Sequence, residues 1–475
     1  MAAIGRLLGM SPAPVAACRV LEVGCADGGN LAALAVTLPE SQFTGFDLAA
    51  EAIASGREML RTVGLANVRL AAADLLEWRP EGRQFDYIIA HGFYSWVPVN
   101  VRDRLFEVIA ATLAPHGIAY VSYNVYPGCF LRKMMAGMMH LHADRLPDPW
   151  QRVAQSRELM KFLLAGQTGE SYAGRILREE AGMVLSESDE NIFHDDLAPI
   201  NDPVWFREFA AHARRFSLAY LAESEFYSSS DHHLPEVVRE VLGQMTAADR
   251  EQYLDFLKCR RFRGSLLVRA GVSSTPEPRA EEIDRLLISS PLAAVSASPS
   301  LAPGAVEEFK DRRGIPLRVD HPLSKAALLH LAGQHPRAVS FPSLVSEASA
   351  MAAPQPVTPD DVEALRNVML RAYQAGLIDL GTHEPAWAPA PGECPMASPL
   401  VRYQVGRKHP FVSSLRHLAV NIDDELAAAM LPLLDGTRNA QKLTAELAAR
   451  FPASDLRQQI DSRLQTAAQQ ALLSA

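Results

Sequence analysis

The sequence predicts an α/β protein whose N-terminal half folds as a doubly wound, Rossmann-like sheet, followed by mainly helical, winged-helix-like domains. Strand and helix patterns alternate between residues 17 and 124, a glycine-rich turn follows the first apolar strand, and carboxylates end the next two strands. This alternation is typical of parallel strands joined by right-handed crossovers. The expected strands are Val20–Val23, Gln42–Asp47, Val68–Ala73, Phe85–Ala90 and Ile118–Tyr123.

The turn after the first strand, residues 24–30, carries three glycines. Missing side chains let the backbone approach a ligand, and the next helix is expected to open at about Gly28 with free N–H groups. Asp47 follows roughly 20 residues later at a strand end, where a carboxylate meets a ribose diol. Asp74 ends the third strand and could accept a hydrogen bond from an adenine amino group. The pattern predicts a cofactor that contains adenosine.

Glu22 distinguishes between two possible cofactors, a dinucleotide and S-adenosylmethionine. The turn alone also nearly satisfies the dinucleotide pattern, as Gly24-x-Ala26-x-x-Gly29. In methyltransferases of the doubly wound class, however, an acid at the position of Glu22 orders the loop and faces the methionine end of S-adenosylmethionine. The alternative is that the glycines only permit tight packing between strand and helix. The residues expected to bind the cofactor are Glu22, Gly24, Cys25, Ala26, Gly28, Asn30, Asp47, Leu48, Asp74, Leu75 and His91.

Composition narrows the classes of function. A chain of 475 residues suggests roughly three domains, and 48% hydrophobic with 21% charged residues is typical of a soluble globular protein. A formal charge of −9 argues against a nucleic-acid partner. We expect a cytoplasmic protein without a membrane span, because the sequence has neither a signal-peptide pattern nor an apolar stretch of the required length.

No metal site is expected. The five cysteines are scattered without the C-x-x-C spacing of a structural zinc site or the pattern of a disulfide framework. His194-Asp195-Asp196 has no second ligand cluster at a suitable spacing, and adjacent histidines such as His232 and His233 point apart in most backbones. Both motifs are interpreted as solvated loops.

Four domains or linkers are expected along the chain. Two late strands, Leu218–Glu223 and Arg261–Arg269, are expected to complete the sheet. The segment 273–321 is rich in Ser, Pro and Ala and is expected to be a loose connection. The predicted boundaries are 1–272 for the sheet domain with helical insertions at about 129–200 and 226–260, 273–321 for a linker, 322–392 for a winged-helix-like domain, and 393–475 for a C-terminal helical domain.

Four segments carry a resemblance to a known family: residues 20–30, 86–98, 120–128 and 433–437. Together they resemble the bacterial class I methyltransferases with a methyltransferase regulatory domain, which include protein lysine methyltransferases of rickettsial type that act on outer-membrane proteins. The resemblance covers nearly the whole chain, and the helical insertions overlap its regulatory region. It implies S-adenosyl-L-methionine as cofactor and a lysine-bearing protein as substrate, and it leaves a homodimer open.

Two other functions stay open: a small-molecule N- or O-methyltransferase, and a scaffold that binds S-adenosylmethionine without activity. The inactive scaffold is suggested by one departure from the family. Its members usually carry, ahead of the helix corresponding to Ile4–Met10, a segment with Tyr and Thr-His-Pro that helps to cover the cofactor. This sequence starts after that segment, so we expect either a misassigned start codon or a missing lid.

The acceptor site is expected beyond the fourth and fifth strands, because ligands of such sheets lie beyond the carboxyl ends of the strands. Tyr94 and Trp96 could line a lysine channel and lower the pKa of the ammonium group by desolvation. His91 is interpreted as a cofactor contact or proton acceptor, with a hydrogen-bonded loop residue as the alternative. Tyr123 and Asn124 could equally line the site or cap the core.

Overall fold

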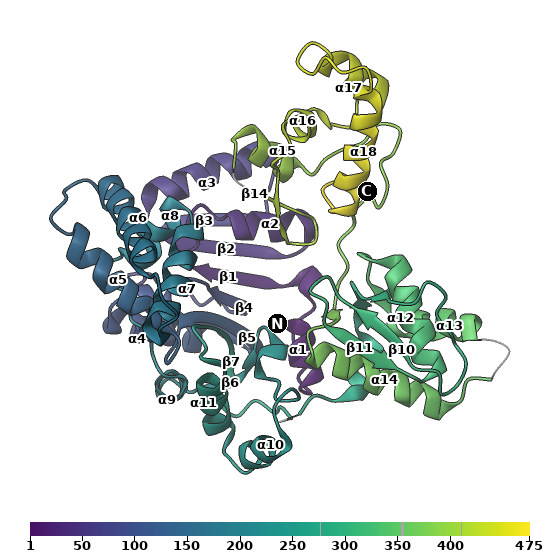
Figure 1. Cartoon of the computed structure of the whole chain (residues 1–475), viewed down its shortest axis with the longest axis horizontal. Helices are drawn as coiled ribbons and strands as arrows, with labels where there is room; N and C mark the ends of the chain where they lie inside the picture. Colours follow the sequence, from purple (N-terminus) through teal and green to yellow (C-terminus); the bar gives the residue numbers. More distant parts are fainter. Residues whose placement is uncertain (276, 353–355, 410) are drawn as a thin grey trace. The chain divides into compact units, whose positions relative to one another are not determined.

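The computed structural model describes residues 1–275, 277–352, 356–409 and 411–475 (Figure 1). These residues form two compact units. The first unit comprises Met1–Ile89, Thr112–Ala119 and Gly271–Ala475, and the second comprises Ala90–Ala111 and Tyr120–Ala270. The expected linker and the two C-terminal domains contain the residues that lie outside the described ranges. Each unit is described by itself below.

A seven-stranded sheet is the central element, with the order β3-β2-β1-β4-β5-β7-β6. Its strands are β1 (Arg19–Val23), β2 (Gln42–Asp47), β3 (Val68–Ala72), β4 (Phe85–Ala90), β5 (Leu113–Asn124), β6 (Leu218–Glu223) and β7 (Phe262–Arg269). β1 pairs in parallel with β2 and β4, β2 pairs in parallel with β3, and β6 pairs antiparallel with β7. The predicted doubly wound sheet is confirmed, with its switch of strand order between β1 and β4.

The first strands form because they are apolar enough to be buried on both faces. Four of the five residues of β1 are buried, as expected for an inner strand of a parallel sheet. Helix α2 (Gly29–Thr37) joins β1 to β2, and α3 (Ala50–Val63) joins β2 to β3 (Figure 1). Both helices follow directly on strand ends, which places their first turns at the edge where a ligand of such a sheet binds.

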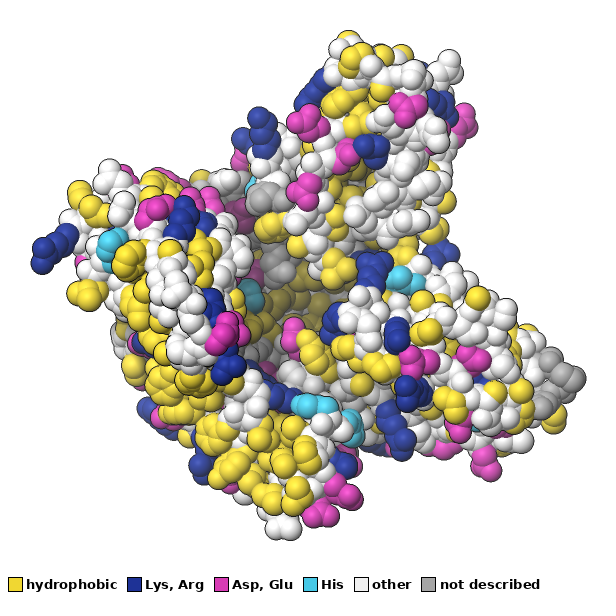
Figure 2. All heavy atoms as spheres, viewed as in Figure 1, with side chains coloured by type: hydrophobic (Ala, Val, Ile, Leu, Met, Phe, Trp, Pro, Cys, Tyr) yellow, Lys and Arg dark blue, Asp and Glu magenta, His cyan; other side chains and the backbone are white. Residues whose placement is uncertain are grey.

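Helices make up most of the second unit. They are α4 (Val99–Thr112), most of which belongs to this unit, α5 (Cys129–Ala143), α6 (Pro149–Gly166), α7 (Tyr172–Ser186), the short α8 (Asp189–Asn191), α9 (Phe206–Arg215), α10 (Glu236–Gly243) and α11 (Ala247–Lys258). The expected helical insertion has a core of its own, in which Met135, Met139 and Met160 are fully buried. Figure 2 shows hydrophobic side chains gathered over α10, where Val237 and Val241 are exposed.

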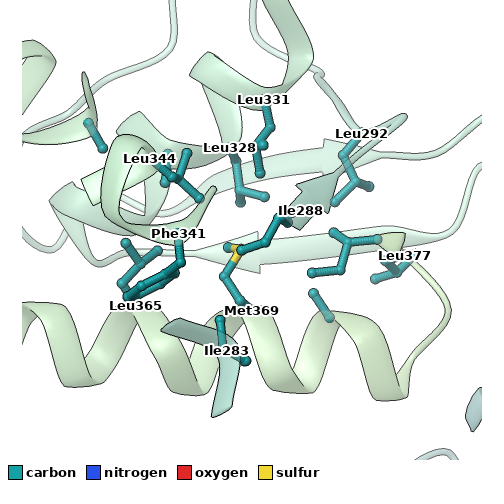
Figure 3. Close-up of a cluster of buried hydrophobic side chains, with 14 of the residues drawn as sticks. Ile283, Ile288, Leu292, Leu328, Leu331, Phe341, Leu344, Leu365, Met369 and Leu377 are labelled. Carbon is teal, nitrogen blue, oxygen red and sulfur yellow. The ribbon is translucent and has the colours of Figure 1, made fainter. Parts of the chain in front are cut away.

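The segment 273–321 corrects one expectation, since it is not a loose connection. It contains β8 (Leu287–Ser289), β9 (Ala293–Ala294), β10 (Glu307–Lys310) and β11 (Pro316–Val319). Ile283, Ile288 and Phe309 are fully buried in a core shared with the helices that follow (Figure 3). The composition concealed this role, because a few apolar residues among many Ser, Pro and Ala are enough to anchor short strands in a neighbouring core.

The helices that share this core are α12 (Pro322–Gln334), α13 (Phe341–Ala352) and α14 (Pro359–Gln374). Strand β8 pairs antiparallel with both β12 (Val339–Ser340) and β13 (Asp379–Gly381). Residues of α1 (Ala2–Leu7) also belong to the core, because Ala3 and Leu7 pack into it. Helices α12, α13 and α14 therefore form one packed body with the preceding segment and the N-terminal helix.

The C-terminal segment has helices and one hairpin. Its elements are α15 (Pro399–Gly406), β14 (Phe411–Ser413), β15 (Ala419–Asn421), α16 (Glu425–Met430), α17 (Ala440–Leu447) and α18 (Leu456–Gln469). Val401, Met430 and Ile460 are fully buried in its core. Only helices were expected here, and the structure adds the β14–β15 hairpin. Across the described residues, no helix combines the length and apolar character needed to cross a membrane.

Candidate active site

The turn after β1 brings the backbone to the surface of the first unit. The N–H groups of Gly24 and Cys25 both donate to the carbonyl oxygen of Phe46, at 3.0 and 3.2 Å, which ties the turn to the end of β2. Gly28 has a φ of +73°, and a Cβ atom there would lie 2.8 Å from a methyl carbon of Leu70. Only glycine fits this position without displacing its neighbours. The turn therefore provides an open backbone surface directly before α2.

Asp47 holds the turn in place. Its carboxylate accepts the backbone N–H of Ala26 at 2.9 Å through one oxygen and that of Ala49 at 2.8 Å through the other. These bonds orient the carboxylate at the end of β2, where remaining lone pairs can accept from a diol. The next residue, Leu48, is 75% exposed and offers an apolar contact. Asp47, Ala26 and Leu48 thus lie together at the end of β2.

Glu22 carries the feature that points most directly to a ligand. It is only 5% exposed, and its Oε1 accepts a hydrogen bond from the side-chain amide of Asn30 at 2.8 Å. Its Oε2 is buried and has no hydrogen-bond partner among the described residues. Burial raises the pKa of this carboxyl to about 7, although the hydrogen bond from Asn30 acts in the opposite direction. A buried carboxylate oxygen without a partner is costly, and a ligand with a donor or positive group would satisfy it.

Cys25, Asp74 and Leu75 complete the predicted set in the first unit. Burial raises the pKa of the Cys25 thiol to about 12, so it stays protonated and acts as a small side chain that fills the turn. Its Sγ lies 2.8 Å from the position that a Cβ atom at Gly45 would take. One oxygen of Asp74 accepts the backbone N–H of Leu76 at 2.9 Å, which orients the carboxylate, and Leu75 is buried.

An adenosine-containing cofactor with a cationic amino-acid end fits these residues. Asp47 and Asp74 offer oriented carboxylates, and Glu22 offers a buried oxygen that lacks a partner among the described residues. The partnerless oxygen is the decisive observation, because a purely structural glycine turn would not require a buried acid beside it.

His91 is the first residue after β4 and belongs to the second unit. Its Nδ1 lies 3.1 Å from the hydroxyl of Tyr120 and 3.2 Å from Oγ of Ser122. The Ser122 hydroxyl accepts the N–H of Gly92 at 2.8 Å, so its own proton is available for Nδ1. Burial lowers the pKa of His91, which favours the neutral ring. A neutral ring whose Nδ1 accepts a hydrogen bond carries its proton on Nε2. This favours His91 as a cofactor contact over His91 as a proton acceptor.

Tyr94 corrects a second expectation, since it lies in the core instead of lining a channel. It is buried, its hydroxyl lies 2.8 Å from Nδ1 of His212, and its ring packs edge-on against Phe209 with centroids 5.2 Å apart. Arg102 lies over the same ring at 5.0 Å. The short 3₁₀ turn at residues 94–96 rotates this side chain inward, and the position at a strand tip does not reveal that rotation.

Tyr123 also belongs to the core. It is fully buried, stacks on Phe209 with centroids 3.8 Å apart, and its hydroxyl lies 2.9 Å from Oγ of Ser265. Of the two roles left open by the sequence, core capping is the one observed. Burial raises the pKa of Tyr123 well above its usual range, which favours the protonated phenol.

Asn124 opens onto a cavity of about 220 Å³ in the second unit, whose wall also includes Lys133, Asp195, Asn201 and Asp202. The side-chain amide of Asn124 donates to Asn201 at 2.8 Å. Asn201 and Asp202 were not among the residues predicted for the site. They stand far from β5 in the sequence and belong to no periodic pattern.

Trp96 lies beside the same group of residues. Its indole N–H donates to the carbonyl oxygen of His194 at 3.3 Å, next to Asp195. Trp96, Asn124 and the two carboxylates Asp195 and Asp202 are therefore the polar and aromatic groups that this part of the second unit brings together. Within the described ranges, no group of three or more His, Cys, Asp or Glu residues is arranged to hold a metal ion.

Comparison with family models identifies three regions of the chain. A methyltransferase domain matches residues 20–117, a predicted methyltransferase regulatory domain matches residues 188–269, and the C-terminal winged helix domain of PKMT matches residues 393–472. The winged helix match covers the segment that contains the β14–β15 hairpin, for which only helices were predicted. The exact domain boundaries stay a prediction.

Relatives and solved structures agree with these matches. Protein RP789 of Rickettsia prowazekii is 29% identical over 461 residues, which cover 94% of this chain and 81% of the relative. Protein RP028 of the same organism is 34% identical over 213 residues, which cover 45% of this chain and 85% of the relative. PKMT2 from Rickettsia typhi, solved alone and in complex with AdoHcy, shares the fold with a TM-score of 0.89 at 24% identity, over 99% of this chain and 97% of that chain. The chain therefore belongs to the methyltransferases that combine a methyltransferase domain with this regulatory domain and the C-terminal winged helix domain of PKMT.

Proposed function

We propose that this methyltransferase uses S-adenosyl-L-methionine and transfers the methyl group to lysine side chains of a protein substrate. The observation that carries the cofactor proposal is the buried Oε2 of Glu22, which has no partner among the described residues and stands beside a turn held by Asp47. The C-terminal winged helix domain supports the protein substrate, because a small acceptor would not need it for recognition.

When bound, S-adenosylmethionine supplies an electrophilic methyl group on a sulfonium. The chain orients it. Asp47 can accept from the ribose hydroxyls while the N–H groups of Ala26 and Ala49 hold its carboxylate still. Glu22 has a pKa raised to about 7, so the approach of a positive amino group ionises it readily and gives a charge-assisted hydrogen bond.

A lysine acceptor must arrive as an ammonium ion and lose its proton before it attacks. Asp195 lies 2.9 Å from Nδ1 of His194, and Asp202 lies 3.5 Å from Arg102 and 3.9 Å from Lys133. The remaining lone pairs of these carboxylates and the side-chain oxygen of Asn124 can accept hydrogen bonds from the ammonium. The half-buried indole of Trp96 offers an apolar face that favours the neutral amine by desolvation. His91, with Nδ1 engaged, is proposed to make a contact through Nε2 and to leave proton removal to water and the carboxylates.

The proposal is tested by incubating the full chain with methyl-labelled S-adenosylmethionine and a bacterial cell lysate, followed by intact-mass analysis of proteins and metabolites. We expect label to be incorporated into protein. Acetylation of the substrate lysines before the reaction should prevent this incorporation. Asn124→Ala should lower the rate of transfer and leave cofactor affinity unchanged.

Each other result selects a different function. Label in metabolites alone would identify a small-molecule methyltransferase. Cofactor binding without transfer to either fraction would identify an inactive scaffold, and label retained after lysine acetylation would exclude lysine as the acceptor. A cytoplasmic location, a homodimer and the absence of a nucleic-acid partner stay predictions from the sequence.

A further inference from the structure

The first unit contains a second cavity, separate from the turn after β1. It has a volume of about 400 Å³ and is lined by α2, by β8, by the segment 379–387 and by the turn between β14 and β15. Leu34, Leu380 and Trp387 contribute apolar surface. Cavities of roughly 300–1,000 Å³ with mostly apolar walls and a few polar groups are typical of small-molecule sites. The polar groups on this wall decide which molecule fits.

Arg416 presents a positive charge to the cavity. It is half-buried, and it makes no hydrogen bond or ion pair with any described residue. Other arginines of the same unit are paired, such as Arg366 with Asp284 at 2.7 Å and Arg313 with Asp311 at 2.6 Å. Burial lowers the pKa of Arg416, although a guanidinium keeps its proton throughout the usual pH range. A charge in this position calls for an anionic group, and a planar carboxylate matches its geometry.

Asp379 and Glu384 lie on the same wall and restrict the choice further. Both raise the pKa of Arg416 through their charge, yet neither comes within ion-pair distance of it. Glu384 accepts the backbone N–H of Ala338 at 3.1 Å, which keeps its carboxylate in place. A ligand with only a negative charge would be repelled by these two carboxylates, and one with only a positive charge would be repelled by Arg416.

Two histidines, His383 and His417, add polar groups to the cavity. The Nε2 of His383 is buried and has no partner among the described residues. His417 has a φ of +60°, a backbone conformation that costs roughly 1–3 kcal/mol and is concentrated at ligand-binding sites. Its Nε2 lies 2.7 Å from the hydroxyl of Thr37 at the end of α2, and burial lowers its pKa, which favours the neutral ring.

We propose that this cavity binds a zwitterionic small molecule of the α-amino acid class with a bulky apolar side chain. Its carboxylate pairs with Arg416, its ammonium group faces Asp379 and Glu384, and its side chain packs on Leu380 and Trp387. This site is distinct from the cofactor residues, and it does not depend on which acceptor the enzyme methylates. Because α2 reaches from the turn after β1 to the cavity wall at Leu34 and Leu38, the ligand would contact the helix that begins at the cofactor turn.

The test uses the full chain labelled with fluorotryptophan, in which the signal of Trp387 is assigned with the Trp387→Phe variant. The probe is L-phenylalanine, compared with phenylpropionate, which lacks the ammonium, and phenethylamine, which lacks the carboxylate. We expect saturable displacement of the Trp387 signal by L-phenylalanine and affinities lower by about tenfold or more for both analogues, because each loses one charged contact.

Two variants of the cavity wall and one control variant complete the test. Arg416→Gln and Asp379→Asn should each weaken the binding of L-phenylalanine by about tenfold or more. Arg407→Gln should not change this binding, because Arg407 lies over the ring of Tyr403, outside the cavity wall. Binding of S-adenosylmethionine to each variant, measured by calorimetry, shows that the fold is intact. No saturable binding of L-phenylalanine, equal binding of phenylpropionate, or undiminished binding by the folded Arg416→Gln variant would each overturn the proposal.

Discussion

Two buried charged groups, one in each unit, are treated by the fold in opposite ways. In the first unit, the carboxyl of Glu22 keeps one hydrogen bond from Asn30 and one oxygen without a partner among the described residues. In the second unit, the guanidinium of Arg263 is fully buried and surrounded by three carboxylates, those of Glu223, Glu251 and Asp255.

The guanidinium of Arg263 is fully paired. Its three nitrogens donate at 2.7 to 3.1 Å to these carboxylates and to the carbonyl oxygen of Glu251, and its Cζ atom lies 4.1 Å from the ring centroid of Phe206. A fully paired buried group serves the structure, because it leaves nothing for a ligand to satisfy. Glu22 is incomplete, and an incomplete buried group marks the place where a ligand completes it. The next four predictions test this difference, from the largest expected effect to the smallest.

Arg263→Met should destabilise the protein by about 3–5 kcal/mol, because it leaves the buried Glu223 without a cation and leaves Asp255 and Glu251 with only Arg260 and Arg250 as partners. The measurement is urea unfolding followed by circular dichroism. Arg207→Ala serves as the control, since Arg207 pairs with Asp249 at an exposed position and its loss should cost at most about 1 kcal/mol. Equal losses for the two variants would mean that the cluster is no more important than a surface ion pair.

The stability of the wild type should fall relative to Glu22→Gln as the pH rises. The folded-state pKa of Glu22 is raised by burial from its usual 4.5 to about 7, so the unfolded chain loses its proton first and unfolding becomes easier across that interval. The expected difference is on the order of 3 kcal/mol. Burial also raises the pKa of Asp255, to about 6, which acts in the same direction in both proteins and cancels in the comparison. Parallel pH profiles of the two proteins would disprove the buried state of Glu22.

Glu22→Gln should also bind S-adenosylmethionine about tenfold to a hundredfold more weakly, since it loses a charge-assisted hydrogen bond worth roughly 1.5–3 kcal/mol. Calorimetry at pH 8 measures the change, and the exposed Glu51→Gln in the first turn of α3 is the matched control. The loss of affinity without a loss of stability is the opposite of what Arg263→Met should show. An unchanged affinity would remove Glu22 from the cofactor site.

Tyr94→Phe should have the smallest effect. It removes the hydroxyl that lies 2.8 Å from His212 and should cost about 0.5–1.5 kcal/mol of stability, with no change in the rate of methyl transfer. Unfolding and a transfer assay on the same preparation measure both quantities. A large loss of methyl transfer with stability retained would show that Tyr94 contributes to the acceptor site.

Local sequence was sufficient for the sheet and for the turn after β1. The strands at Gln42–Asp47 and Phe85–Ala90 agree with β2 and β4, and the positions of Glu22 and Asp47 follow from their distance to the glycine turn. These features depend on neighbours in the sequence: a strand end, a glycine with positive φ and an acid at a set spacing. The sheet, the turn and the positions of these two acids can therefore be predicted from the sequence alone.

Side-chain direction and long-range partners were decided only by the tertiary structure. Tyr94 and Trp96 stand two residues apart at the same strand tip, yet one is held in the core by Phe209 and the other contacts His194. Phe309, within a segment expected to be a linker, completes a core built from residues before and after it. Arg416 faces a cavity whose wall includes Leu34, far away in the sequence. Packing among segments distant in sequence set each of these outcomes, and no local pattern of residues encodes such packing.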